Sequence, residues 1–307
     1  MTDYGYCCIN MTMKEQRNVY VGRKMIKKTF DQKGIAGAAE LAEANLNDMI
    51  EILIWNKIKG IKLYRMSSDM FPWMSEYELT DLPNYDKICE LLQEAGQIAR
   101  QSGQRLTFHP GPFNVIASAN EAIVIKAIKD LRQHGEIMDL MCLPRSPFSA
   151  INIHIGGTYG DKEATKRRFA DNFKRLPESA STRLVIENDD KAAQYSVQDL
   201  VDIHQMTGAT PVTFDYHHHW CYNDPMPEEQ ALKLASTTWP KGIKQLCHYS
   251  SCKKIYEDQS STNIRAHADY VYDRINDYGL DLDIELEAKA KEKALLQYVK
   301  QFQTELV

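Results

Sequence analysis

The stretch "PVTFDYHHHW" at residues 211–220 contains the unit from which the fold can be predicted. Its apolar and β-branched run ends at Asp215, and three histidines follow directly. A short run that is apolar on both faces is typical of a buried strand in a parallel sheet. The same unit, followed by a helical pattern, recurs along the chain. It predicts eight strands, at residues 4–10, 61–68, 105–110, 150–157, 183–189, 211–218, 243–251 and 281–289.

The segments between these runs are predicted to be helical. Between residues 85 and 103 the apolar residues keep helix spacing, and Gly103 stands where a C-cap belongs. The pattern "SANE" at 118–121 is a capping box that predicts the start of the next helix, and "SVQD" at 196–199 is a weaker one. The remaining predictions are a loop within 11–44, a helix near 45–59, and helices at 161–176, 227–238, 263–278 and 288–306.

Eight strands that alternate with helices in 307 residues indicate one (β/α)8 TIM barrel, a single domain spanning residues 1–307. The alternative is a doubly wound open sheet. The strand count favours the barrel, and so does the lack of a Gly-x-Gly-x-x-Gly pattern after the first strand.

Composition narrows the class of protein. Apolar residues make up 43% of the chain and charged residues 26%, as in folded water-soluble proteins. We find no apolar run of about 18 residues, the length that a membrane span needs, and no basic flank followed by an apolar stretch at the N-terminus. The seven cysteines are scattered and form no C-x-x-C pair, which predicts reduced thiols. These features predict a cytoplasmic protein, associated with the nucleoid if the source is bacterial.

The net charge of −5 argues mildly against a polyanionic partner, since nucleic-acid binders usually carry a basic excess. A local basic face or a metal cluster can compensate for that charge. The basic stretches "RKMIKK" (23–28) and "DKEATKRRF" (161–169) are, taken alone, more typical of solvated helix surface.

Titratable side chains gather at the predicted strand ends, where a barrel of this kind has its active site. Two or more carboxylates and histidines on one rim would cost several kcal/mol of desolvation and repulsion unless a cation holds them. Mixed histidine and carboxylate sets suit zinc, manganese or iron, so the pattern predicts a multi-metal site. The residues are His109, His154, Glu187, Asp215 with His217 to His219, His248 and Glu287, with His267 at the start of the helix after the seventh strand.

The three adjacent histidines cannot all face one point, because neighbours on an extended chain point to opposite sides. In the pattern D-x-x-H, Asp215 and the residue three positions later can reach the same rim as the chain turns into its loop. The spacing therefore selects His218, and it predicts that His217 and His219 point away into structural roles.

Other catalytic patterns are weaker. The sequence has no Gly-x-Ser-x-Gly elbow and no cysteine in an evident partnership with histidine. The stretch "GGTYGDK" at 156–162 has glycines ahead of a helix and could bind an anion, which would suit a phosphodiester substrate.

The motifs resemble those of the UV damage endonuclease family and, more distantly, endonuclease IV. The resemblance runs in order from about residue 4 to residue 294. It implies a TIM-barrel endonuclease with up to three divalent metals, usually manganese, that nicks DNA 5′ to a UV photoproduct or other distorting lesion and leaves a 3′-hydroxyl. The matching stretches are "RMSSDMFPW" (65–73), "FHPG" (108–111), "NIHIGGTYGDK" (152–162), "IENDD" (186–190), "FDYHHH" (214–219) and "EAKAKE" (287–292), with "HYSS" and "HADY" between them.

On the matching positions, the resemblance implies a set of metal ligands and a partner, damaged double-stranded DNA. The cofactor would be two or three Mn²⁺ ions, with Zn²⁺ or Mg²⁺ as alternatives, and two-metal chemistry would activate water and stabilise the leaving oxygen. No membrane and no protein partner is implied. The implied ligands are His109, His154, Glu187, Asp215, His218, His248, His267 and Glu287. Of these, Glu187, Asp215 and Glu287 are the predicted catalytic residues, and the predicted DNA or lesion contacts are Tyr6, Asn10, Pro112, Phe113, Tyr159 and Lys162.

Two positions depart from the family pattern. After His-Pro-Gly the family usually has glutamine and an aromatic residue that probe distorted bases, and this chain has Pro112 and Phe113. Two residues before His248 the family often has a lysine near the metals, and this chain has Leu246. The departures leave the metal chemistry in place and put the specificity for UV products in question.

Three other functions compete with this prediction. An abasic-site endonuclease of the endonuclease IV type would suit the change at Pro112. A metal-dependent sugar isomerase or epimerase also places carboxylates and histidines at strand ends, although eight ligands exceed its one- or two-metal site. A non-catalytic DNA-binding relative would not need the complete ligand set.

Overall fold

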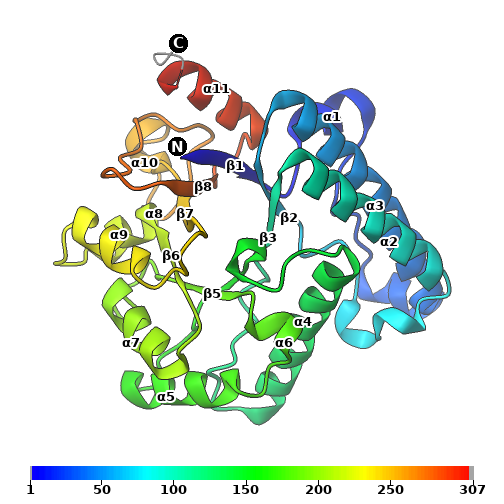
Figure 1. The fold of residues 1–307 in the computed structure, drawn as a ribbon, viewed down its shortest axis with the longest axis horizontal. Helices are drawn as coiled ribbons and strands as arrows, with labels where there is room; N and C mark the ends of the chain where they lie inside the picture. The colour runs from blue at the N-terminus through cyan, green and yellow to red at the C-terminus, as the bar shows by residue number, and fades with distance from the viewer. Residues whose placement is uncertain (1, 304–307) are drawn as a thin grey trace.

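The computed structural model describes residues 2–303, and in it eight parallel strands close into a barrel (Figure 1). Each strand pairs with the next in sequence, and β8 pairs with β1, with Tyr4 opposite Ile284. The predicted TIM barrel and its eight strands are confirmed, and the doubly wound sheet is excluded. The strands are β1 (Asp3–Cys7), β2 (Leu63–Met66), β3 (Arg105–Phe108), β4 (Ile151–Ile153), β5 (Leu184–Glu187), β6 (Val212–Asp215), β7 (Gln245–Tyr249) and β8 (Leu282–Leu286).

Helices surround the barrel, and most lie where helical spacing predicts them. The core fills the space between these helices and the outer faces of the strands. Among residues 2–303, no helix combines the length and the apolar composition needed to cross a bilayer. The helices are α1 (Met11–Arg17), α2 (Lys27–Lys59), α3 (Tyr85–Ser102), α4 (Glu121–Leu140), α5 (Lys162–Phe173), α6 (Glu178–Ser181), α7 (Val197–Thr207), α8 (Tyr216–Tyr222), α9 (Glu228–Ser236), α10 (Lys253–Tyr256) and α11 (Glu292–Phe302), with short 3-10 turns η1 (Met74–Glu76), η2 (Leu79–Asp81) and η3 (Pro147–Ser149).

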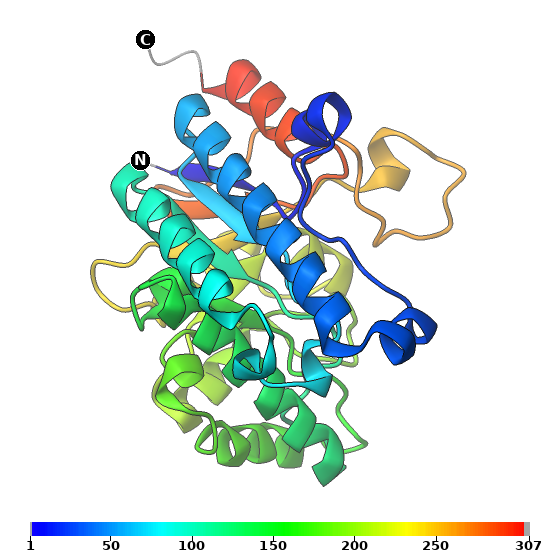
Figure 2. The same cartoon turned by 90° about the vertical axis from the view of Figure 1, so that its right-hand side faces the viewer.

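Helix α2 is longer than predicted. It begins at Lys27, so most of the predicted loop before residue 45 is helical, with a kink at Gly34, where φ is +60°. Buried residues at helical spacing, among them Ala38, Ala42 and Leu46, hold α2 alongside α3 (Figure 2). The glycine and the charged residues near this kink resemble a loop in sequence, but tertiary packing keeps the segment helical.

Two further predictions about helices are wrong. Helix α4 is capped by Asn120, whose side chain accepts from the Ala122 N–H, while the Ser118 side chain accepts from the Asn120 N–H just before the helix. Residues 263–278 form no helix. Their backbone bonds to other segments instead, because Ala268 donates to the Ser251 carbonyl at 2.9 Å and accepts from Lys289 at 3.0 Å.

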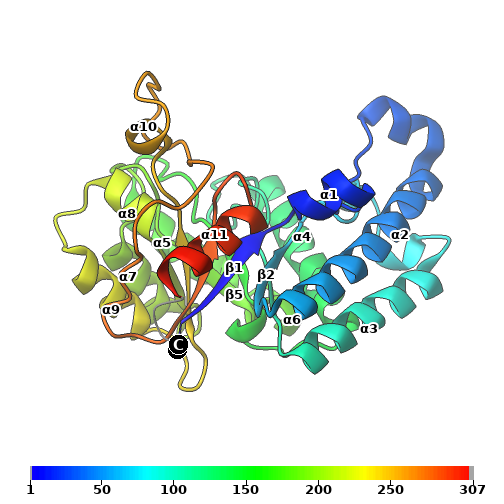
Figure 3. The same ribbon diagram turned by 90° about the horizontal axis from the view of Figure 1, so that it is seen from above.

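The segment between β7 and β8 therefore leaves the barrel as a long excursion with only the short α10. It projects on the same side of the molecule as α1 and the start of α2 (Figure 3). The last predicted helix, 288–306, is confirmed as α11 at residues 292–302, and residues 304–306 lie outside the described range.

The barrel interior has an apolar layer between polar groups at its two ends. Leu246 packs with Leu63 and Val185 in a small buried cluster, and at the amino end Arg105 pairs with Asp283 at 2.7 Å. At Leu246, where the family often has lysine, the side chain therefore brings no charge to the rim above. The polar residues of the site lie at the carboxyl ends of the strands.

Candidate metal centre

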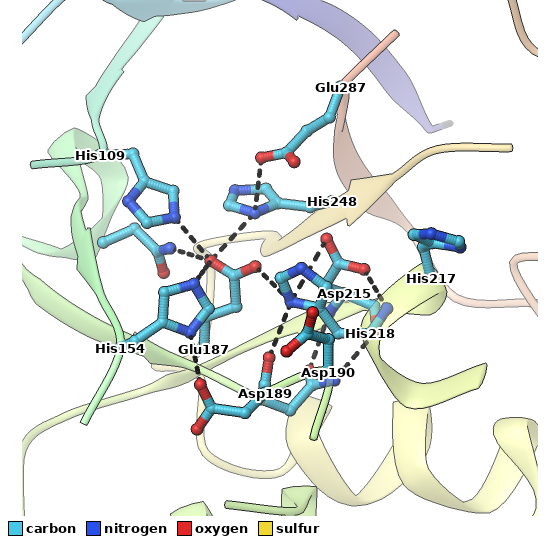
Figure 4. Close-up of polar contacts among 12 residues, drawn as sticks. His109, His154, Glu187, Asp189, Asp190, Asp215, His217, His218, His248 and Glu287 are labelled. Carbon is cyan, nitrogen blue, oxygen red and sulfur yellow. Dashed lines mark hydrogen bonds and ion pairs between the residues drawn. The ribbon is translucent and has the colours of Figure 1, made fainter. Parts of the chain in front are cut away.

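Parallel strands end on the same side of the barrel, and six of them deliver a titratable side chain to one point (Figure 4). Glu187 and Asp215 are the last residues of β5 and β6, and His248 lies within β7. His109 and His154 follow β3 and β4 closely, and Glu287 directly follows β8. The strand-end argument thus locates the side chains that the fold brings together.

Glu187 lies at the centre of this cluster, and its side chain is fully buried. Its Oε2 lies 2.9 Å from His109 Nε2, 3.2 Å from His248 Nδ1 and 3.7 Å from His154 Nε2. The same oxygen accepts a hydrogen bond from the Asn152 amide. A buried carboxylate with several imidazoles at this distance is a candidate metal ligand.

The donor atoms fall into three overlapping groups in which all atoms lie within 4.8 Å of one another. Glu187, His109 and His248 each belong to two of the groups. This sharing is the arrangement expected of neighbouring ions bridged by common ligands. The groups are His109–His154–Glu187, His109–His248–Glu287 and Glu187–Asp215–His248.

Backbone carbonyls fix the protonation of three rings. His109 Nδ1 lies 3.3 Å from the Pro110 carbonyl, His218 Nδ1 lies 3.0 Å from that of Asn188, and His267 Nδ1 lies 3.0 Å from that of Glu287. A carbonyl oxygen only accepts, so each Nδ1 carries the hydrogen in the neutral ring, and each Nε2 keeps a lone pair for a metal. Such outer partners are typical of metal-binding histidines.

Several buried polar atoms of the cluster lack hydrogen-bond partners within the described structure. They include Glu187 Oε1, Asp215 Oδ2 and both ring nitrogens of His248, which have ion-pair neighbours at 3.1 to 3.9 Å but form no hydrogen bond. In addition, the His109 Nε2 lone pair faces a carboxylate oxygen at 2.9 Å. Leaving such groups unpaired costs about 1–3 kcal/mol each, and more for charged ones. A cation among them would satisfy these atoms, so the residues present fit a divalent metal centre.

The two central carboxyl groups have pKa values displaced in opposite directions. Burial opposes ionisation of Glu187, but the imidazoles of His248, His154 and His109 hold its pKa well below the usual range. Burial raises the pKa of Asp215 above its usual value, in spite of the opposing effect of His218. Strongly perturbed carboxyl groups are concentrated at functional sites.

The histidine run divides as the D-x-x-H spacing predicts. His218 Nδ1 lies 3.2 Å from Glu187 Oε1 and 3.9 Å from Asp215 Oδ2. His217 points away from the cluster and stacks on Trp220, with ring centroids 5.7 Å apart (Figure 4). His219 donates from Nε2 to the Met226 carbonyl at 3.0 Å.

His267 reaches the site from the excursion between β7 and β8, so the prediction that it lies at the start of a helix is wrong. Its Nδ1 lies 3.6 Å from Glu287 Oε2, at the edge of the cluster. Glu287 also accepts a 2.6 Å hydrogen bond from Arg65, at the third position of β2. Sequence reasoning gave Arg65 no role, because its partner Glu287 lies 222 positions further along the chain.

The lesion contacts predicted at Tyr6 and Asn10 are wrong for this structure. Both side chains are fully buried, and the Tyr6 hydroxyl donates to Asn56 at 2.8 Å and accepts from Asn10 at 3.2 Å. Asn10 also caps α1 by accepting from the Met13 N–H. These bonds join α1 and α2 to β1, so neither side chain could reach DNA unless the packing of these three elements were disrupted.

Two other predicted lesion contacts, Pro112 and Phe113, lie in the loop after β3. Phe113 is 87% exposed, and Pro112 lines a cleft of about 390 Å³ together with His154 and His218. The cleft also touches Gly156, where φ is +97° and an added Cβ would lie 2.5 Å from Val115 Cγ1. This close approach fixes the Phe113 loop against the loop that follows β4.

The two residues predicted from "GGTYGDK" differ in their accessibility. Tyr159 is half exposed, and the Arg168 guanidinium lies 5.3 Å from its ring centroid. Lys162 is the first residue of α5, and its Nζ pairs with Asp199 at 2.9 Å. Lys162 therefore joins α5 to α7, and its side chain stays partly exposed, so its contact with DNA stays a prediction.

A closed barrel with histidines and carboxylates gathered at its carboxyl rim defines the class of this protein as a TIM barrel suited to a divalent-metal centre. Within that class, the chain belongs to the UV-endonuclease UvdE family, whose model matches residues 2–306.

Relatives and solved structures agree with this membership. The chain is 36% identical over 293 residues to the UV-damage endonuclease of Neurospora crassa, covering 90% of this chain and 43% of the relative. It is 34% identical over 317 residues to the UV-damage endonuclease of Schizosaccharomyces pombe, covering 97% of this chain and 50% of the relative. The chain thus spans about half the length of these fungal relatives. The crystal structure of SacUVDE matches with a TM-score of 0.85 and 28% identity over 99% of each chain.

More distant structures share the fold alone. Endonuclease IV from Thermus thermophilus matches 98% of each chain with a TM-score of 0.55 and 14% identity. Sugar epimerases match at a similar level, for example D-psicose 3-epimerase from Clostridium cellulolyticum, with a TM-score of 0.55 and 12% identity over 93% of this chain and 84% of that one.

Proposed function

We propose that this chain is a divalent-metal-dependent DNA repair endonuclease. It nicks the phosphodiester backbone 5′ to UV photoproducts or other distorting lesions and leaves a 3′-hydroxyl. Family membership supports the reaction class. The observation that carries the metal dependence is the buried carboxylate of Glu187, which contacts His109, His154, His218 and His248 within 3.7 Å.

The metal ions are two or three in number, manganese by preference, with zinc or magnesium as alternatives. When bound, such ions lower the pKa of water and neutralise charge on a phosphodiester. The residues that would hold them are His109, His154, Glu187, Asp215, His218, His248, His267 and Glu287.

The chain itself orients these ligands and binds the substrate. Arg65 holds one oxygen of Glu287, which fixes the direction of that carboxylate and offsets part of the buried negative charge. Exposed cations on the rim loops, such as Lys191 and Lys289, can contact the DNA backbone near the centre. They compensate locally for the acidic net charge of the chain.

Metal content is the first quantity that the proposal predicts. After loading with manganese and removal of free metal, the purified protein should retain two or three Mn²⁺ per chain, because the ligands outnumber what one ion can use. Elemental analysis measures the ratio. One ion or none would contradict a cluster.

Phe113 is the proposed lesion probe. Base–aromatic stacking is worth roughly 1–3 kcal/mol, so Phe113→Ala should weaken binding to damaged duplex by about ten- to a hundredfold, with metal content unchanged. Fluorescence anisotropy with lesion-bearing duplex measures the change. Phe148→Ala is the matched control, because Phe148 is also exposed but lies in η3, which precedes β4 at the opposite end of the barrel. If Phe113→Ala binds damaged duplex like the parent, the probe lies elsewhere.

Nicking assays test the reaction itself. The protein with Mn²⁺ is incubated with duplexes that carry a photodimer, an abasic site or no lesion, and the cleavage site and new end are mapped. Cleavage 5′ to the photodimer with a 3′-hydroxyl is expected, and no cleavage of either damaged duplex would contradict the proposal. Cleavage of the abasic duplex alone would favour the second candidate, an abasic-site endonuclease. That candidate is favoured by Pro112, which has no side-chain donor for a base edge.

A further inference from the structure

Asn188 is a buried residue of the site to which sequence reasoning gave no role. It directly follows Glu187 and is 1% exposed. Strand pairing between β5 and β6 runs from Ile186 opposite Val212 to Glu187 opposite Thr213. Beyond that pair, the Asn188 side chain makes the next hydrogen bonds between β5 and β6. Its Nδ2 donates to the Asp215 carbonyl at 3.0 Å, and its Oδ1 accepts from the Asp215 N–H at 2.8 Å.

This pair of bonds fixes the Asp215 peptide, and the peptide in turn fixes two ligands. Asp215 Oδ1 accepts from the His218 N–H at 2.7 Å and so caps α8, while Oδ2 is buried without a hydrogen-bond partner among the described residues. The main-chain carbonyl of Asn188 also accepts from His218 Nδ1 at 3.0 Å. One residue thus contacts both members of the D-x-x-H pair and is joined covalently to Glu187.

We propose that Asn188 is a positioning residue that sets Asp215 and His218 in register with Glu187 for metal binding, an inference that rests on the proposed function. Its side-chain amide holds the peptide that orients the Asp215 carboxylate, and its carbonyl selects the His218 ring whose Nε2 is free to bind a metal. Without the amide, the buried N–H and C=O of Asp215 lose their partners and the chain must shift to satisfy them.

Asn188→Ala should therefore weaken Mn²⁺ binding by about 10- to 100-fold, the usual effect of removing an outer partner of a metal ligand. Isothermal titration of Mn²⁺ into the metal-free protein measures the affinity without reference to activity. Nicking should recover at higher Mn²⁺, with the concentration dependence shifted by the same factor. A purely structural defect would lower the plateau and leave the Mn²⁺ dependence in place.

Asn45→Ala is the matched control. Asn45 is also fully buried and bridges backbone groups, accepting from the Arg23 N–H at 2.9 Å and donating to the Met70 carbonyl at 3.0 Å. It lies in α2, and neither of these partners is one of the proposed metal ligands. Both variants should lose thermal stability, and only Asn188→Ala should lose Mn²⁺ affinity.

Asn188→Asp is a second variant of nearly the same shape. It keeps the test possible if the Asn188→Ala protein does not fold. It keeps an acceptor for the Asp215 N–H and loses the donor to the Asp215 carbonyl. Added negative charge alone would tighten Mn²⁺ binding, whereas loss of positioning weakens it, so weaker binding is the expected result. Parent-like or tighter binding by either folded variant would overturn the role of Asn188. Failure of the parent protein to bind Mn²⁺ would overturn the proposed function instead.

Discussion

Replacing Glu187 with glutamine should remove most of the bound Mn²⁺ and lower the rate of nicking by roughly a thousandfold or more. Loss of an outer partner costs about 10- to 100-fold, and a residue that faces four imidazoles directly should matter more. Glutamine keeps the size of the side chain and removes its charge and one of its two acceptor oxygens. Elemental analysis and single-turnover nicking of lesion-bearing duplex measure the two losses.

Asp283→Asn is the control for this change. Asp283 is another buried carboxylate inside the barrel, but it pairs with Arg105 at the amino end and contacts none of the rim histidines that the structure describes. Its replacement should lower the unfolding temperature, because breaking a buried ion pair is destabilising. The Mn²⁺ content should stay at the level of the parent. If Glu187→Gln retained full metal and activity, the centre would not be organised around Glu187.

The second large effect is expected in the histidine run. His218→Ala should lose at least one metal ion and nearly all nicking, since His218 contacts Glu187 and is oriented by the Asn188 carbonyl. His217→Ala and His219→Ala should keep their metal, because one ring stacks on Trp220 and the other bonds to the Met226 carbonyl. The two variants are matched controls, because each of them also replaces one histidine of the same run with alanine. Equal loss of metal from all three variants would rule out the D-x-x-H interpretation.

Local pattern was sufficient to predict the barrel. Each strand is a short apolar run that ends in a polar residue, and the strand ends of a parallel barrel must meet at one rim. That rule brought Glu187, Asp215 and His248 together without any knowledge of distance. The roles of the eight implied ligands in binding metal stay predictions, and so does the division of the chain into domains.

Features that depend on contacts distant in sequence could not be predicted. Arg65 lies 222 positions before Glu287, with which it pairs, and nothing in local spacing signals that contact. The family resemblance implies lesion contacts at Tyr6 and Asn10, yet packing against α1 and α2 buries both side chains. Residues 263–278 have helical spacing, but their backbone groups bond to neighbouring loops. In each case tertiary structure overrode the local preference.

The contact between Gly156 and Val115 has an evolutionary consequence. Any side chain at position 156 would be strained by the positive φ and would collide with Val115, which a stiff β-branched residue cannot relieve by rotation. The loop that carries Phe113 and the loop that follows His154 therefore cannot drift apart independently. We expect exchanges of the side chains at the tip, at Pro112 and Phe113, to be tolerated, whereas changes in the path of either loop should also displace His154. Relatives should therefore differ more in the chemistry of these two side chains than in the course of the two loops.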